Sequence, residues 1–122
     1  MFWKKKETNT VEIGWENLTQ TTQLEKIIEE SKEQPVLIYK HSTRCGISSM
    51  ALDRLERSWD EDGNAIKPYF LDLIANRNIS NIVAEMFNVY HQSPQIIVIK
   101  NGKAVFDDSH MGVSFQAVKN AI

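Results

Sequence analysis

Apolar residues in this 122-residue chain follow two patterns, continuous short runs and positions spaced three or four residues apart. A short apolar run bounded by breakers predicts a buried strand, and spacing near 3.6 predicts a helix with one packed face. The runs lie at residues 36–39, 68–73 and 95–100. A weaker strand is predicted at residues 11–15, where apolar and polar residues roughly alternate.

Helical spacing first appears at Thr22, where Thr22 and Glu25 form the pattern of a capping box. The helix is expected to end before Pro35, because the residue preceding a proline disfavours the α region. A second helix is predicted after Cys45 and should fade between Trp59 and Gly63. Its apolar residues are Ile47, Met50, Ala51 and Leu55.

A third helix is marked by the regular set Ile79, Ile82, Val83, Met86 and Phe87. Ser93 and Pro94 then break the chain before the strand at 95–100. Asn101 and Gly102 favour a type I′ turn, which predicts that residues 103–107 return antiparallel. Ser114 is expected to cap a last helix.

The predicted order β-α-β-α-β-α-β-β-α indicates an α/β fold. Its central sheet should be mixed, with helices on both faces and a C-terminal antiparallel hairpin plus helix. The alternation of strands and helices predicts parallel strands up to the hairpin, and right-handed crossovers leave few topologies open. A thioredoxin-like topology fits this order best.

Composition indicates one domain over residues 1–122, with residues 1–10 as a flexible N-terminal segment. Lys and Arg number 14 and Asp and Glu 16, so the net charge of -2 argues against binding to nucleic acid. We see no apolar run long enough for a signal peptide or a membrane span. Cys45 is the single cysteine, which excludes an intramolecular disulfide and fits the cytoplasm.

Cys45 is the candidate catalytic residue, since it falls between a buried strand and the start of a helix. Free N–H groups from Gly46, Ile47 and Ser48 and the positive end of the helix dipole can stabilise a thiolate there. The thiolate is the nucleophile in thiol–disulfide exchange, and Arg44 adds a positive charge beside it.

Ser48 occupies the position of the second cysteine in a Cys-x-x-Cys redox motif. A hydroxyl can donate a hydrogen bond to a thiolate but cannot resolve a disulfide, so an adduct on Cys45 must pass to an outside thiol. In a thioredoxin-like site a proline loop faces the cysteine, with its peptide bond cis. We therefore expect Pro94 to be that cis-proline and the Ser93 backbone to pair with an extended substrate.

Two segments, His-Ser-Thr-Arg-Cys-Gly-Ile-Ser at residues 41–48 and Gln-Ser-Pro-Gln at residues 92–95, carry a family resemblance. The chain resembles the bacilliredoxin-like monothiol proteins of the thioredoxin superfamily over nearly its whole length. Members often read Thr-Cys-Pro-Ile-Ser, whereas this chain has Arg44 before the cysteine and Gly46 after it. The resemblance implies that Cys45 is the nucleophile and Pro94 the cis-proline.

The resemblance also implies removal of bacillithiol, or a similar low-molecular-weight thiol, from mixed disulfides on oxidised proteins. The small thiol is then a co-substrate, with no tightly bound cofactor. The expected partners are S-thiolated client proteins, and a small thiol or a separate reductase for recycling, with no nucleic acid and no membrane. The residues alone do not choose between bacillithiol and glutathione.

Other readings of these residues remain open. Cys45 could belong to a redox sensor or a partner-binding module that does not turn over. An arsenate-reductase-like enzyme would need an arginine cluster for its oxyanion, and the other arginines are Arg54, Arg57 and Arg77. His91, near Pro94, could act as a base for Cys45. His41, His91 and His110 are scattered, so no metal site is expected.

Overall fold

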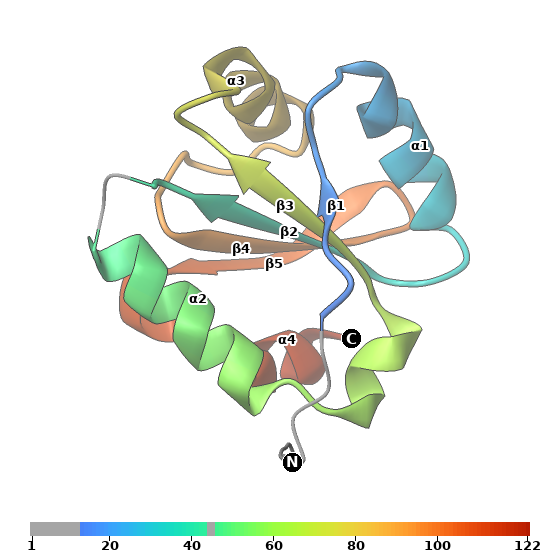
Figure 1. Cartoon of the computed structure of the whole chain (residues 1–122). Helices are drawn as coiled ribbons and strands as arrows, with labels where there is room; N and C mark the ends of the chain where they lie inside the picture. Colours follow the sequence, from blue (N-terminus) through green and yellow to red (C-terminus); the bar gives the residue numbers. More distant parts are fainter. Residues whose placement is uncertain (1–12, 44–45) are drawn as a thin grey trace, which may run out of the picture.

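The computed structural model describes residues 13–43 and 46–122, and five strands form one mixed sheet (Figure 1). They are β1 (Glu16–Asn17), β2 (Val36–His41), β3 (Lys67–Asp72), β4 (Gln95–Lys100) and β5 (Lys103–Ser109). The order across the sheet is β1-β3-β2-β4-β5. The pairs β1–β3 and β3–β2 are parallel, whereas β2–β4 and β4–β5 are antiparallel.

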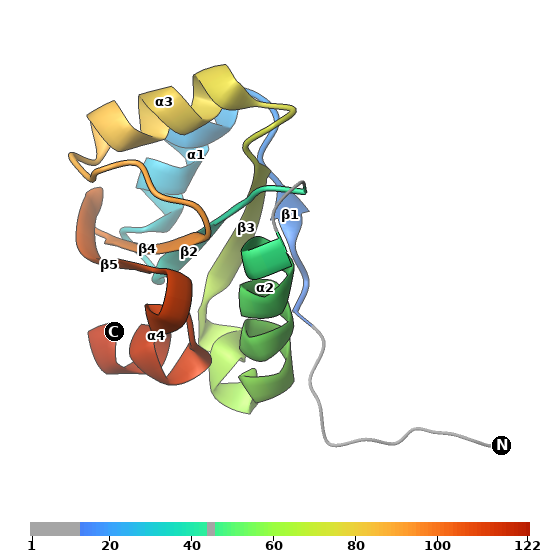
Figure 2. The ribbon, with the colours of Figure 1, turned by 90° about the vertical axis from the view of Figure 1, so that its left-hand side faces the viewer.

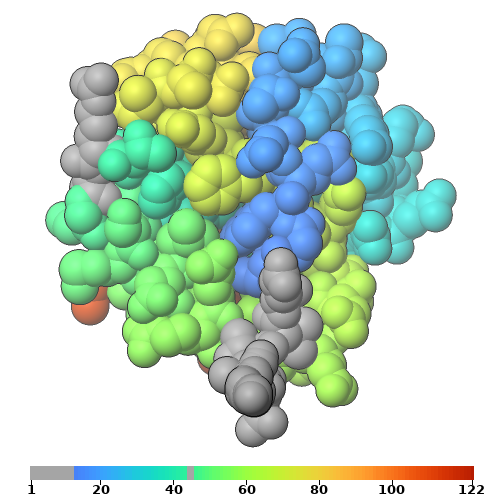
Figure 3. Space-filling view, in the orientation of Figure 1, coloured from blue at the N-terminus to red at the C-terminus, as the bar shows by residue number. Residues whose placement is uncertain are grey.

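The helices cover both faces of this sheet, as the sequence predicted. They are α1 (Thr22–Glu30), α2 (Gly46–Ser58), α3 (Arg77–Met86) and α4 (Phe115–Ala121), with 3-10 turns η2 (Glu61–Ala65) and η3 (His110–Gly112). Helices α1 and α3 lie on one face, and α2 and α4 lie on the other (Figure 2). The space-filling view shows the segment around β1 running down the molecule between α1 and α2 (Figure 3).

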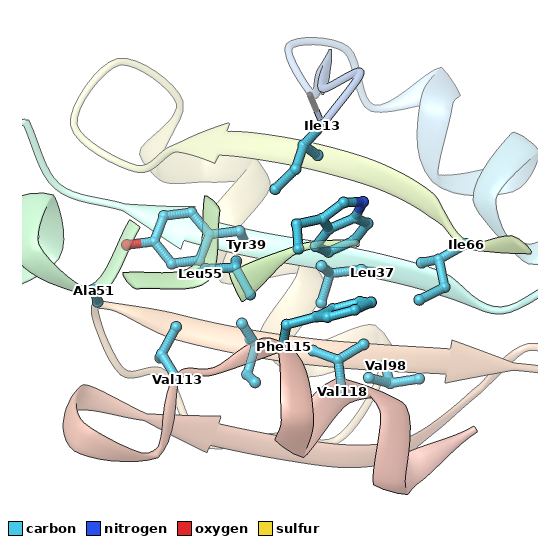
Figure 4. Close-up of a cluster of buried hydrophobic side chains, with 12 residues drawn as sticks. Ile13, Leu37, Tyr39, Ala51, Leu55, Ile66, Val98, Val113, Phe115 and Val118 are labelled. Carbon is cyan, nitrogen blue, oxygen red and sulfur yellow. The ribbon is translucent and has the colours of Figure 1, made fainter. Parts of the chain in front are cut away.

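Two apolar clusters hold these layers together, because successive side chains of a strand point to opposite faces. Leu37 and Tyr39 of β2 pack toward α2 and α4 with Leu55 and Phe115 (Figure 4). Ile38 packs on the other side in the cluster under α1 and α3. Strand β2 is buried over its whole length and is the centre of the fold.

The direction of β4 differs from the prediction of parallel strands up to the hairpin. Gln95, the first residue of β4, pairs with Lys40 near the end of β2, so the two strands run in opposite directions. Helix α3 crosses the same face of the sheet as α1 (Figure 2), and the chain enters β4 beside the end of β3, since Lys40 pairs with both Leu71 and Gln95. A pattern of alternating elements does not distinguish these two paths.

Two further predictions near the N-terminus were wrong. Residues 13–15 are not in a strand, and the strand is Glu16–Asn17 instead; residues 11 and 12 lie outside the described part. The side chain of Thr22 forms no capping box, because α1 begins after Thr21 without a side-chain cap. Gln23 Oε1 accepts from the N–H groups of Thr19 and Gln20 at 2.8 Å each.

The C-terminal predictions are confirmed. Asn101 and Gly102 have φ of 53° and 77°, as a type I′ turn requires. The Ser114 side chain accepts from Ala117 N at 3.1 Å and caps α4. In residues 13–43 and 46–122 no helix is both long and apolar enough to cross a bilayer.

Candidate functional site

The predicted site around Cys45 lies between the end of β2 and the start of α2. Arg44 and Cys45 fall outside the described residues, so their predicted roles stay predictions. The helix begins at Gly46, the residue after Cys45, and the first-turn N–H groups of Gly46, Ile47 and Ser48 have no helical acceptor. Gly46 and Ile47 are exposed, whereas Ser48 is fully buried.

The buried Ser48 connects three parts of the fold. Its Oγ accepts from Ser42 N at 3.3 Å, just beyond the end of β2, and lies 3.4 Å from Ser93 Oγ. Tyr39 OH donates to the Ser48 carbonyl oxygen at 2.7 Å from within the sheet. The position that holds a second cysteine in dithiol sites is therefore used here to connect α2 with the end of β2 and with the segment before Pro94.

The segment that precedes β4 is fixed at both ends. The Ser93–Pro94 peptide bond is cis, and the Pro94 carbonyl oxygen accepts from His110 N at 3.1 Å. The buried Gln95 donates from Nε2 to Tyr90 O at 2.8 Å, and its Oε1 accepts from Gln92 N at 3.4 Å. The structure thus places Ser93 and Ser48 together; a substrate-binding role for Ser93 and Pro94 stays a prediction.

Sequence reasoning missed Lys40, which is fully buried in β2. Its Nζ donates to Ser80 O and contacts His91 Nδ1, both at 3.2 Å, and Ser80 Oγ lies 3.2 Å from the same Nδ1. Burial lowers the pKa of Lys40 to about 8. In the sequence, its burial was indicated only by its place directly after the apolar run 36–39. As residue i+2 from Ile38, Lys40 faces the same side of β2 as that buried side chain.

His91 therefore has defined contacts, although its predicted role as a base for Cys45 is untested. Burial of the ring nitrogen, and then the charges of Lys40 and Arg77, lower the pKa of His91. The residue as a whole is exposed. The neutral form is the one that can accept at Nδ1 from an ammonium.

His41 ends β2, as the sequence indicated, and is buried with 7% of its surface exposed. Its ring lies against Phe70 with centroids 5.2 Å apart, and Nδ1 has no hydrogen-bond partner among the described residues. Burial lowers the pKa of His41, with smaller opposing effects from Asp72 and Glu56. Burial therefore favours the neutral form of this imidazole, which packs against Phe70 at the end of β2.

An apolar hollow of about 200 Å³ lies on the other side of α2, lined mainly by Ile47, Met50 and Met111. Arg54 stands at its edge and donates to Val113 O at 2.9 Å and His110 O at 2.8 Å. Arg57 pairs with Asp53 at 2.9 Å. Arg54 and Arg57 are thus engaged by carbonyl oxygens and by a carboxylate of the protein itself, which does not support the arginine cluster that an oxyanion site would need. Among the described residues no three His, Cys, Asp or Glu groups gather as a metal site.

Comparison with known proteins agrees with this geometry. A family model described as monothiol bacilliredoxin BrxC matches residues 16–118. A solved thioredoxin-fold protein, described provisionally as an oxidoreductase, is 30% identical, with a TM-score of 0.74 over 86% of this chain and 90% of the other.

More distant solved structures have the same fold. Thioredoxin from Trypanosoma brucei brucei is 16% identical, with a TM-score of 0.69 over 94% of this chain and 96% of its own. Thioredoxin from Fasciola hepatica is 22% identical, with a TM-score of 0.60 over 76% and 84%. The predicted thioredoxin-like fold is confirmed.

Proposed function

Because this chain belongs to the monothiol bacilliredoxin family, we propose that it removes a low-molecular-weight thiol of the bacillithiol type from mixed disulfides on oxidised proteins. Thiol redox function, as a thioredoxin-fold oxidoreductase, follows from the family and from the 30% identical structure. The identity of the small thiol and the direction of transfer are the proposal.

The observation that best supports it is the environment of Ser48. The side chain is buried and engaged with Ser42 and Ser93, at the spacing from Cys45 that a resolving cysteine has in a dithiol site. A hydroxyl cannot take over a disulfide, so the adduct on Cys45 has to wait for a thiol from outside. A small-thiol adduct is the species that such a site is suited to carry.

The proposed reaction consists of two exchanges. The Cys45 thiolate attacks the small-thiol sulfur, a disulfide between Cys45 and the small thiol forms, and the client sulfur leaves as a thiolate that takes a proton from water. A second small-thiol anion then attacks the adduct, forms the symmetrical small-thiol disulfide and releases the Cys45 thiolate. That disulfide carries away the oxidising equivalents, and each exchange is fastest for a thiol whose pKa lies near ambient pH.

The remaining parts of the proposal concern cofactors, partners and location. The protein uses no tightly bound cofactor and takes the small thiol as co-substrate. Its partners are S-thiolated client proteins and either a small thiol or a separate reductase. We place this chemistry in the cytoplasm, where thiols are kept reduced.

The test is turnover on a client protein loaded with either bacillithiol or glutathione, followed by intact-protein mass spectrometry. Wild type is compared with Cys45→Ser and with Ser58→Ala, a matched serine removal at the far end of α2. We expect turnover with bacillithiol, none for Cys45→Ser, and wild-type rates for Ser58→Ala. A stable adduct without turnover on either client would instead identify a sensor.

A further inference from the structure

Lys40 is an unusual residue for the centre of a sheet. Lysine is almost never fully buried without a charged partner, yet Lys40 is 0% exposed and no carboxylate contacts it within residues 13–43 and 46–122. Among these described residues its ammonium group contacts the Ser80 carbonyl and His91 Nδ1. Packing alone would be served equally well by methionine.

Through His91, Lys40 contacts the segment of residues 90–94, which includes Ser93. An ammonium group has donors only, so His91 Nδ1 has to be the acceptor and the proton of neutral His91 has to reside on Nε2. His91 lies three residues before Pro94, in the segment that Gln95 fixes to Tyr90. Lys40 thus connects this segment to the C-terminal end of β2, while Ser48 contacts it from α2.

We propose that Lys40 is a positioning residue which, through His91, holds residues 90–94 in the geometry that binds the client polypeptide. This inference rests on the proposed function, in which the Ser93 backbone pairs with the client. It goes further because it states that Lys40, whose side chain lies on the face of the sheet opposite α2, affects the affinity for the client. Neither residue needs to touch the reacting sulfur atoms.

Protonation of His91 should remove the Lys40 contact and loosen the segment, with Ser80 Oγ, 3.2 Å from the same Nδ1, left as an acceptor. Imidazolium has no acceptor at Nδ1 and repels the Lys40 ammonium, so the contact is lost as the pH falls through the His91 pKa. The charges around His91 are Lys40 from β2, Arg77 from α3, and Glu85 of α3, which lines the same surface hollow. At high pH the contact persists, because a neutral amine can still donate.

Four variants separate this role from simple packing. Lys40→Met keeps the volume and removes the donor, and His91→Ala removes the acceptor. His91→Asn places an amide oxygen near the position of Nδ1 without a titrating group. Lys67→Met is the matched control, since Lys67 lies on β3 opposite Val36, at the other end of β2.

We expect Lys40→Met and His91→Ala to raise the KM for the S-thiolated client roughly three- to tenfold with kcat little changed, as for the loss of a pre-ordered binding segment. His91→Asn should keep the wild-type KM at neutral pH. The ratio of the wild-type KM to the His91→Asn KM should rise as the pH falls through the lowered pKa of His91, and this ratio cancels the ionisation of the nucleophile. Lys67→Met should resemble wild type.

NMR gives a readout that does not depend on turnover. In Lys40→Met, amide exchange of Gln92 and Ser93 should accelerate and the His91 pKa should rise, because a neighbouring positive charge is lost. Unchanged exchange and KM in Lys40→Met, or the same acid rise in His91→Asn as in wild type, would overturn the inference. If no client is turned over at all, the proposed function fails, and the exchange rates alone then decide whether Lys40 orders this segment.

Discussion

Substitution of Ser48 by alanine tests whether this serine connects α2 to the end of β2 and to the segment before Pro94. The change removes an acceptor for Ser42 N and a partner for Ser93 Oγ, in a side chain that is 0% exposed. Both contacts are long, at 3.3 and 3.4 Å, and both partners are half-buried, so water can replace part of what is lost. We therefore expect a loss near the low end for buried hydrogen bonds, about 1–2 kcal/mol in total.

The corresponding shift in Tm follows from the size of the chain. At about 2.1 cal/mol/K of unfolding entropy per residue, that loss lowers Tm by about 4–8 °C for a domain of this length. Urea unfolding and calorimetry of wild type, Ser48→Ala and Ser58→Ala measure it. Ser58 is exposed, and within the described part of the chain its hydroxyl donates only to carbonyls of its own helix, so its removal should change the free energy of unfolding by less than about 0.5 kcal/mol. Equal stabilities for the two variants would refute the role assigned to Ser48.

Three further predictions concern the same framework. Ser48→Cys should form an intramolecular disulfide with Cys45 under mild oxidation, seen as the loss of both free thiols on titration, and an unchanged thiol count would contradict a resolving position at residue 48. Burial lowers the pKa of Lys40 to about 8, so the unfolded state binds more protons between pH 8 and 10.5 and the free energy of unfolding should rise across that window by at most about 3 kcal/mol. Lys40→Met should lack this rise in urea titrations, and a rise of equal size in both proteins would exclude Lys40 as its source. Gly102→Ala should cost about 1–2 kcal/mol, because φ is +77° there, whereas Gly14→Ala, with open space around it, should not.

The elements that the sequence predicted well are those whose signal is local. The strand at residues 95–100 and the turn at Asn101 and Gly102 match the structure, because an apolar run and a positive-φ dipeptide each determine their own conformation. The prediction of a strand at residues 11–15 was wrong for residues 13–15, because the apolar side chains of Ile13 and Trp15 are buried or half-buried by packing and not by strand pairing. Both pack into the cluster under α2 without strand pairing, and pairing starts only at Glu16 opposite Tyr69.

The site shows the same division between local and long-range information. The first turn of α2 and the break at Pro94 were predicted from spacing and residue type. The contact of Ser48 with Ser93 joins residues 45 positions apart, and that of Lys40 with His91 joins residues 51 apart. Such contacts depend on how the chain crosses the sheet, and the direction of β4 was itself not predictable from the order of elements.

The most direct test of the proposed mechanism is a single-turnover reaction with excess protein over bacillithiol-loaded client, quenched with acid and resolved by intact mass. We predict the bacillithiol mass on Cys45 and an equal amount of fully reduced client, with neither species formed by Cys45→Ser. A disulfide between Cys45 and the client, or client that keeps its bacillithiol while Cys45 stays unmodified, would contradict the account.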